Sequence, residues 1–195
     1  MKYLIISFIL SATACKSDKQ QEQTPEGWSQ QIKNDIAAIT DNDDLKGYLE
    51  YIYDLDQKVR KEESQALKEH GRYSDEYPLA VENLLQVDNQ NFQRIDAILA
   101  QFGYPSPDSV GRKAAQAPWI IVHRSKDYAY RIKHFPIIYD AYAKGNISDN
   151  AISRFLDGTY RIKFNRKFSM SGSYEKRQKI DELIKALELK TSIVE

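Results

Sequence analysis

The stretch LLQVDNQNFQRIDAILAQFG, residues 84–103, decides the fold class. Its apolar residues recur every three or four positions, which is the spacing of one face of an α-helix. Gly103 ends the pattern, and the Tyr-Pro-Ser-Pro that follows is a firm helix break. The apolar stripe consists of Leu84, Leu85, Phe92, Ile95, Ile98, Leu99 and Phe102. This stretch therefore predicts a long amphipathic helix with one buried face.

The same spacing recurs along most of the chain. It predicts helices over about residues 28–39, 45–70, 78–102, 109–123, 127–144, 148–163 and 174–187. Ser148 and Ser173 are the expected N-caps of the last two helices, and Pro118 and Pro136 are expected to disturb two others. No strand alternation, internal repeat or heptad array is present. The sequence therefore predicts an all-α fold, a single-domain irregular helical bundle of about seven helices.

Composition fits one globular domain. The chain has 195 residues, of which 42% are hydrophobic and 29% are charged, so a sizeable core is possible. One Cys excludes an intrachain disulfide. A formal net charge of zero argues against a protein that binds nucleic acid through bulk positive charge.

The amino terminus reads as a targeting segment. Lys2 is followed by an uncharged apolar run from Tyr3 to Ala14, which is too short to span a bilayer as a helix. We interpret residues 1–14 as a signal peptide. Residues 15–27 are polar and lack an apolar period, so we expect a flexible tether there and the helical domain over residues 28–195.

The small residues before Cys15 resemble a bacterial lipoprotein cleavage box, although Ala12 stands where such boxes usually carry a bulky aliphatic residue. This resemblance implies cleavage before Cys15 and lipidation of its thiol and amine, which would anchor the chain in a membrane. Lys16 stands where lipoproteins retained in the inner membrane usually carry Asp, so the resemblance favours the outer membrane. An ordinary secreted protein with a free Cys is the alternative.

The zero net charge hides an acidic half and a basic half. Residues 16–108 contain 10 Lys and Arg against 19 Asp and Glu, whereas residues 109–179 contain 15 against 5. The two halves either face each other or are solvated helix faces, or else the basic half binds an anionic glycan or a protein. The centre of such a basic face would be the segment 154–167, which contains Arg154, Tyr160, Arg161, Lys163, Phe164, Arg166 and Lys167.

Several short polar elements follow one another in a recognisable order. They are residues 56–60 (DQKVR), 88–91 (DNQN), 103–106 (GYPS) with 110–111 (VG), and 117–123 (APWIIVH) followed by Asp127. Together they resemble an uncharacterised bacterial domain family of unknown function, common in exported and lipid-anchored proteins. The resemblance covers residues 49–157 and implies no reaction. This sequence departs from the family pattern after Asp157, where Gly158 replaces an expected Arg and no Tyr-Gly-Thr-Gln-like run follows.

The polar residues of these elements are spaced to share helix faces. On continuous helices, His123 would lie beside Asp127, Asp88 beside Asn91, and Gln57 beside Arg60. An Asp that fixes the tautomer of a His leaves the other ring nitrogen as a base, so His123 and Asp127 are the candidate catalytic pair. The candidate binding residues are Gln57, Arg60, Asp88, Asn91 and Asp157. A buried polar network that only ties helices together is the competing interpretation.

The sequence leaves the molecular function open. We expect no cofactor and no metal, because no phosphate-binding Gly loop, dinucleotide fingerprint or recognised ligand spacing is present. The first hypothesis is a cell-envelope lipoprotein that acts as a binding or accessory module. The alternatives are a hydrolase or lyase of envelope material that uses His123 and Asp127, and an immunity-type protein that neutralises a toxin in the periplasm.

Overall fold

The computed structural model describes residues 25–191, which form eight α-helices and no strand. The helices are α1 (Pro25–Ala37), α2 (Asn42–His70), α3 (Glu76–Phe102), α4 (Pro107–Ala114), α5 (Ala117–Arg124), α6 (Tyr128–Ala143), α7 (Asp149–Phe164) and α8 (Lys176–Leu187). The prediction of an all-α bundle of about seven helices is confirmed. The signal peptide, Cys15 and the tether up to residue 24 lie outside the described residues.

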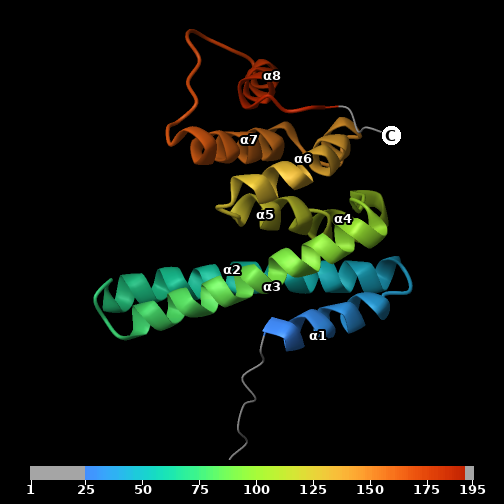
Figure 1. Cartoon of the computed structure of the whole chain (residues 1–195), viewed down its shortest axis with the longest axis vertical. Helices are drawn as coiled ribbons and strands as arrows, with labels where there is room; N and C mark the ends of the chain where they lie inside the picture. Colours follow the sequence, from blue (N-terminus) through green and yellow to red (C-terminus); the bar gives the residue numbers. More distant parts are fainter. Residues whose placement is uncertain (1–24, 192–195) are drawn as a thin grey trace, which may run out of the picture.

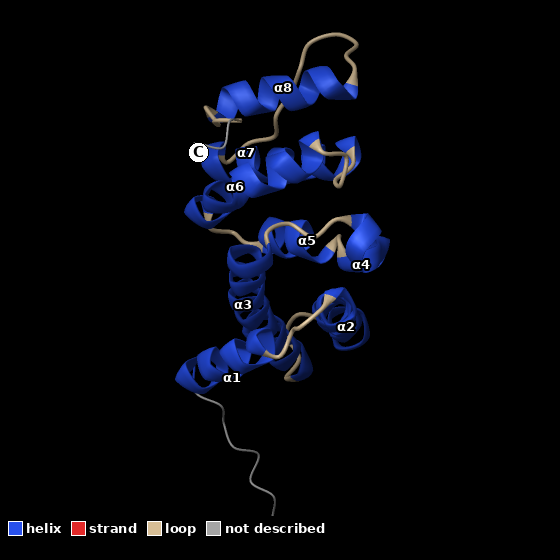
Figure 2. Cartoon of the chain, turned by 90° about the vertical axis from the view of Figure 1, so that its right-hand side faces the viewer, coloured by secondary structure: helices blue, strands red, loops and turns tan. Residues whose placement is uncertain are grey.

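The helices stack in successive layers along the long axis of the molecule (Figure 1). The long helices α2 and α3 pack against each other, with α1 beside α3, at one end. The short helices α4 and α5 form the middle layer, and α6 and α7 lie beyond them, with α8 against α7 at the far end (Figure 2). Within residues 25–191, no helix combines the length and the apolar character needed to span a bilayer.

Helix α5 holds the layers together because it contacts α2, α3, α6 and α7. Its sequence APWIIVHR is apolar on almost every face, and five of its eight residues are buried. A helix that is apolar all round is stable only when it is surrounded by other elements. The core continues from α5 into Ile95 and Ile98 of α3 and into Phe155 and Leu156 of α7, all completely buried.

The prediction of one helix over residues 109–123 is wrong, because two helices occupy this stretch. Gly111 has a φ of 81° and ψ of 159°, which is not a helical conformation and kinks α4. Ser106 caps α4 with its hydroxyl, and Pro118 stands in the first turn of α5, where the absence of its N–H costs no hydrogen bond. The spacing of apolar residues indicates which helix face is buried. This spacing continues from α4 into α5, so it gave no sign that one helix ends and another begins.

The remaining boundaries follow the expectations closely. Ser148 caps α7, as the sequence predicts, and Asp41 caps α2. Pro136 lies inside α6 without ending it. The expected cap at Ser173 is wrong, because α8 begins two residues later, after Glu175. The face of α8 expected to point inward is buried, and it consists of Ile180, Leu183, Ile184 and Leu187.

Arg131 fastens the corner where α5, α6 and α7 meet. It is only 2% exposed, and its Nε donates to Ser125 O at 2.8 Å. Its Nη1 donates to Phe155 O and to Thr159 Oγ1, both at 3.2 Å, and its Nη2 donates to the carbonyl oxygen of His123. Burial lowers the pKa of Arg131 to about 10, so the guanidinium stays charged at neutral pH. One side chain on α6 thereby satisfies carbonyls at the end of α5 and within α7.

Gly158 makes this corner possible. A Cβ at position 158 would lie 2.7 Å from Arg131 Nη1 and 2.9 Å from His123 Cε1, closer than atoms pack. Gly158 sits inside α7 with helical neighbours, where Gly normally costs about 1 kcal/mol relative to Ala. The chain therefore accepts a poor helix former to let the guanidinium and the imidazole approach the α7 backbone.

This close approach predicts opposite effects for two glycine substitutions. Gly158→Ala should lower the free energy of unfolding, because Arg131 must shift and its buried hydrogen bonds are lost. Gly47→Ala, inside α2 with open space around it, should raise the free energy of unfolding by about 0.5–1 kcal/mol. Urea unfolding followed by circular dichroism measures both, and a stabilising Gly158→Ala would contradict this account of the corner.

Candidate functional site

Asp56 is the centre of a polar network between α2 and α5. Its side chain is fully buried, and its position on α2 brings Gln57 and Arg60 of the same helix within reach. Asp56 accepts hydrogen bonds from Arg60 Nε at 2.8 Å and from Gln57 Nε2 at 2.7 Å. Arg124, at the end of α5, donates its Nη2 to the second carboxylate oxygen at 3.1 Å. One buried carboxylate therefore fixes two guanidinium groups from two helices.

Arg60 extends this network to α3. Its Nη2 donates to Asp88 Oδ1 at 2.6 Å, so the guanidinium bridges Asp56 and Asp88. Burial raises the pKa of the Asp88 carboxyl, and the nearby Arg60 partly opposes this shift. The predicted binding residues Gln57, Arg60 and Asp88 are thus brought together, and they tie α2, α3 and α5 to one another.

A groove of about 570 Å³ opens beside the two arginines. Its lining comes from α2 and from the last residue of α5, and consists of Gln57, Arg60, Lys61, Ser64, Gln65, Lys68, Glu69 and Arg124. Four of these eight residues are cationic and one is acidic. The network is therefore buried on the Asp56 side and reaches solvent on the arginine side, where the side chains of Arg60 and Arg124 are 25% and 31% exposed.

Asn91 belongs to a different cluster. It is fully buried, and its Oδ1 accepts from Arg94 Nη1 at 2.9 Å one turn along α3. Arg94 also donates to Gln90 Oε1 at 3.2 Å and lies over the ring of Tyr51. The sequence places Asp88 and Asn91 on one helix, but Asp88 bonds to α2 whereas Asn91 bonds within α3. The spacing of Asp88 and Asn91 on one helix therefore does not bring the two side chains into one site.

His123 and Asp127 do not share a helix face, so this expectation is also wrong. Helix α5 ends at Arg124, and Ser125 follows with a ψ of 138°, which turns the chain away from the helix axis. Asp127 is exposed and caps α6, accepting a hydrogen bond from the backbone N of Ala129 at 2.8 Å. A spacing of four places two side chains together only where the helix is continuous.

The surroundings of His123 keep its imidazole neutral. Burial lowers its pKa to about 3, with help from the positive charges of Arg131, Arg124, Arg154 and Lys126. Its Nδ1 is buried and has no hydrogen-bond partner among the described residues. A general base works best with a pKa near the working pH, and an orienting carboxylate would raise the pKa rather than lower it. This His is therefore suited to hydrogen bonding rather than to proton abstraction.

A pocket of about 410 Å³ lies against His123 on the α7 side. The other lining residues are Asn150, Ser153, Arg154, Asp157, Gly158 and Arg161, all on α7. Asp157 forms an ion pair with Lys179 of α8. This pair partly neutralises the Asp157 carboxylate and links α8 to α7. The structure thus places the predicted residues His123 and Asp157 at one pocket, apart from the groove that Gln57 and Arg60 line.

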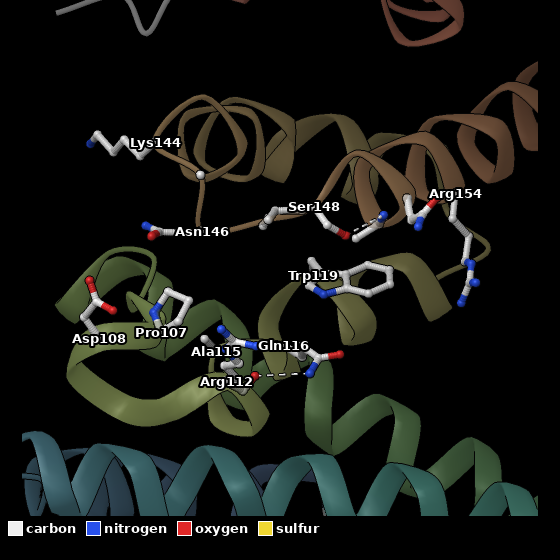
Figure 3. A pocket seen from close by; sticks show the side chains of 14 residues that line it. Pro107, Asp108, Arg112, Ala115, Gln116, Trp119, Lys144, Asn146, Ser148 and Arg154 are labelled. Carbon is white, nitrogen blue, oxygen red and sulfur yellow. Dashed lines mark hydrogen bonds between the residues drawn. The ribbon is translucent and has the colours of Figure 1, made fainter. Parts of the chain in front are cut away.

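A larger cleft of about 710 Å³ adjoins this pocket and shares Asn150 and Arg154 with it (Figure 3). Its walls come from α4, from the first part of α5, from the turn that joins α6 to α7, and from the first half of α7. Trp119 lies between these walls in Figure 3, but it is only 8% exposed and presents little of its ring. The cationic lining residues are Arg112, Lys144 and Arg154, and Asp108 is the acidic one.

The basic segment 154–167 does not act as one surface. Arg154 and Arg161 line the pocket beside His123, whereas Tyr160 is buried and packs on Phe164. Lys163 donates to the carbonyl oxygen of Leu187 at 3.3 Å and so caps the end of α8. Among residues 25–191, no group of three or more His, Cys, Asp or Glu side chains is arranged to hold a metal ion.

The sequence interpretation missed Asp56, Arg124 and the cleft. Asp56 and Arg60 are four residues apart on one helix, and this spacing of opposite charges is a usable signal. Arg124 carries no such signal, because its partner lies 68 residues earlier in the chain. The pair Asp96 and His134 was also missed, with His134 Nε2 2.7 Å from Asp96 Oδ1 between α3 and α6. Long-range contacts of this kind depend on how the layers stack.

The Asp56 network predicts a large difference between two aspartates of α2. Asp56→Asn removes the buried negative charge, which leaves Arg124 without its carboxylate and Arg60 with Asp88 alone, and should cost about 3–5 kcal/mol of unfolding free energy. Asp54→Asn removes an exposed pair with Lys113 and should cost less than about 1 kcal/mol. Chemical unfolding of both variants is the measurement. Equal losses would show that Asp56 is no more important than a surface carboxylate.

Comparison with known protein families identifies the family of this chain. A family model described as a family of unknown function, DUF6624, matches residues 43–167. This range includes the Asp56 network, the groove, the larger cleft and the pocket beside His123. Searches of curated proteins and of solved structures found no match. The chain therefore belongs to DUF6624, a family of unknown function.

Proposed function

We propose that this protein is a cell-envelope lipoprotein whose helical domain binds an anionic glycan in the cleft between α4–α5 and the α6–α7 turn. The cleft itself is the observation that carries the proposal. It is large enough for a small ligand, and it combines cations with neutral hydrogen-bonding side chains. The neutral ones are Gln116, Asn146, Ser148 and Asn150.

The charges of the cleft favour an anion. Lys144 is paired with Asp140 at 2.7 Å, but Arg112 and Arg154 form no ion pair with any described residue. Both side chains belong to exposed residues, so their guanidinium groups are available to a ligand. A guanidinium binds a carboxylate through two parallel hydrogen bonds, and the neutral amides and hydroxyls suit sugar hydroxyls. Arg161 and the neutral His123 of the adjoining pocket extend the same surface.

Binding is better supported than hydrolysis. The hydrolase hypothesis needs an oriented base, whereas Asp127 caps α6, and burial together with nearby positive charges lowers the pKa of His123 to about 3. No observation favours the immunity-type hypothesis. An exported protein with an anchored amino terminus would meet glycans of the envelope directly. The expected tether would end where α1 begins at Pro25, rather than at residue 27, and would hold the domain away from the bilayer.

Lipidation is tested by labelling. We expect palmitate to be incorporated into the wild-type chain and to be absent from Cys15→Ser, because Cys15 is the sole thiol. The processed wild-type protein should be found in the outer-membrane fraction and the variant in the soluble envelope fraction. Label in the Cys15→Ser variant would contradict anchoring at this residue.

Ligand binding is tested with a matched pair of sugars. The disaccharide of N-acetylglucosamine and N-acetylmuramic acid carries a carboxylate, whereas N,N′-diacetylchitobiose does not. We expect calorimetry to show binding of the first only, and Arg154→Gln to weaken it by about tenfold, the equivalent of one charge-assisted contact. Arg166→Gln removes an exposed charge outside the cleft and should change the affinity less than about twofold. Equal binding of both sugars, or equal losses in both variants, would contradict the proposal.

A further inference from the structure

The groove that Arg60 and Arg124 line on the α2 side of α5 is a second candidate site. It is separate from the cleft proposed to bind a glycan. It shares no lining residue with the cleft or with the pocket beside His123. Its cationic residues are Arg60, Lys61, Lys68 and Arg124, and Glu69 is its only acidic lining residue. Counting Asp56 and Asp88, which lie behind the arginines, the cations still outnumber the carboxylates by one.

The two arginines are fixed but not fully used. Asp56 accepts a hydrogen bond from one nitrogen of each guanidinium, and Asp88 accepts one from a second nitrogen of Arg60. Within residues 25–191, Arg60 Nη1 and Arg124 Nη1 donate no hydrogen bond, and Arg124 Nε is buried without a partner. A buried donor without an acceptor costs about 1–3 kcal/mol unless something from solvent satisfies it. The carboxylate of Asp56 thus holds two guanidinium groups in place with donors to spare.

The lysines add charge without neutralising partners. Lys61 and Lys68 line the groove about two helical turns apart on α2, and neither forms an ion pair with a described residue. Glu69 accepts from Gln65 at 2.9 Å, which draws its carboxylate along α2. No aromatic or aliphatic residue lines the groove, so apolar contact contributes little to what it binds. Such a site suits a compact, highly charged group rather than a sugar ring.

We propose that the Arg60–Arg124 groove binds a phosphate group. Phosphate is tetrahedral, carries up to two charges near neutral pH, and accepts hydrogen bonds on several oxygens, so it can use both guanidinium groups at once. The buried Asp56 is a positioning residue that sets the separation of the two guanidinium groups. The phosphate belongs either to a free phosphate compound or to a lipid headgroup of the membrane that anchors the chain.

The test measures binding of inorganic phosphate by calorimetry at constant ionic strength. Arg124→Gln should weaken binding by tenfold or more, and Lys68→Gln, an exposed change that spares the fold, by about two- to fivefold. Glu69→Gln removes the one opposing charge and should strengthen binding two- to fivefold, a gain that a purely structural role would not produce. Lys58→Gln, on the same helix outside the groove, and Arg154→Gln, in the glycan cleft, should stay within twofold of wild type.

A second arm uses vesicles of phosphatidylcholine with and without 30% phosphatidylglycerol. Vesicle binding that needs phosphatidylglycerol and is lost in Arg124→Gln and Lys68→Gln supports a lipid headgroup as the source of the phosphate. Saturable binding of inorganic phosphate with the same losses supports a free phosphate compound. The proposal is overturned if neither probe binds, or if Lys58→Gln weakens binding as much as Lys68→Gln. Because Arg154→Gln tests the glycan cleft alone, the two proposals can fail independently.

Discussion

The fold depends on the buried guanidinium of Arg131, which forms no ion pair with a carboxylate among residues 25–191. Arg131 donates to carbonyl oxygens at the end of α5 and within α7, and to the hydroxyl of Thr159. The last carbonyls of a helix have no partner inside the helix and carry partial negative charge, so a cation there is favourable. A short helix such as α5, with eight residues, is not stable by itself. The Arg131 side chain lets α5 end abruptly inside the molecule without leaving its carbonyls unsatisfied.

The helices could be predicted from the sequence because each buries one face against a neighbour. The apolar stripe of residues 84–103 and the caps at Asp41 and Ser148 are local signals, and local chemistry decides them. The sequence indicated a disturbance at Pro118 but did not predict two separate helices, because apolar spacing continues through the break and Gly111 acts on the backbone. The role of Arg131 was equally hidden, because its partners are mostly backbone carbonyls, and every residue offers one.

The candidate sites were predictable only in part, because some of their contacts are local in the sequence and others depend on tertiary packing. Gln57 and Arg60 meet Asp56 within two turns of one helix, so their spacing was informative. The sequence also indicates Asp157 beside Gly158, but only the stacking of α7 on α5 shows why Gly stands there. His123 and Asp127 have equally suggestive spacing, yet the chain turns at Ser125 between them. A pair inside one helix is predictable only where no neighbouring helix offers a stronger partner, as Arg60 does for Asp88, whereas pairs across a turn depend on tertiary contacts.

The end of α5 also determines how the two proposed sites relate to each other. His123 and Arg124 are adjacent residues, yet His123 lines the pocket on the α7 side and Arg124 lines the groove on the α2 side. Both depend on the same last turn of α5, whose carbonyls Arg131 holds. A change in the position of this turn would alter the lining of both sites, because each site takes one side chain from it.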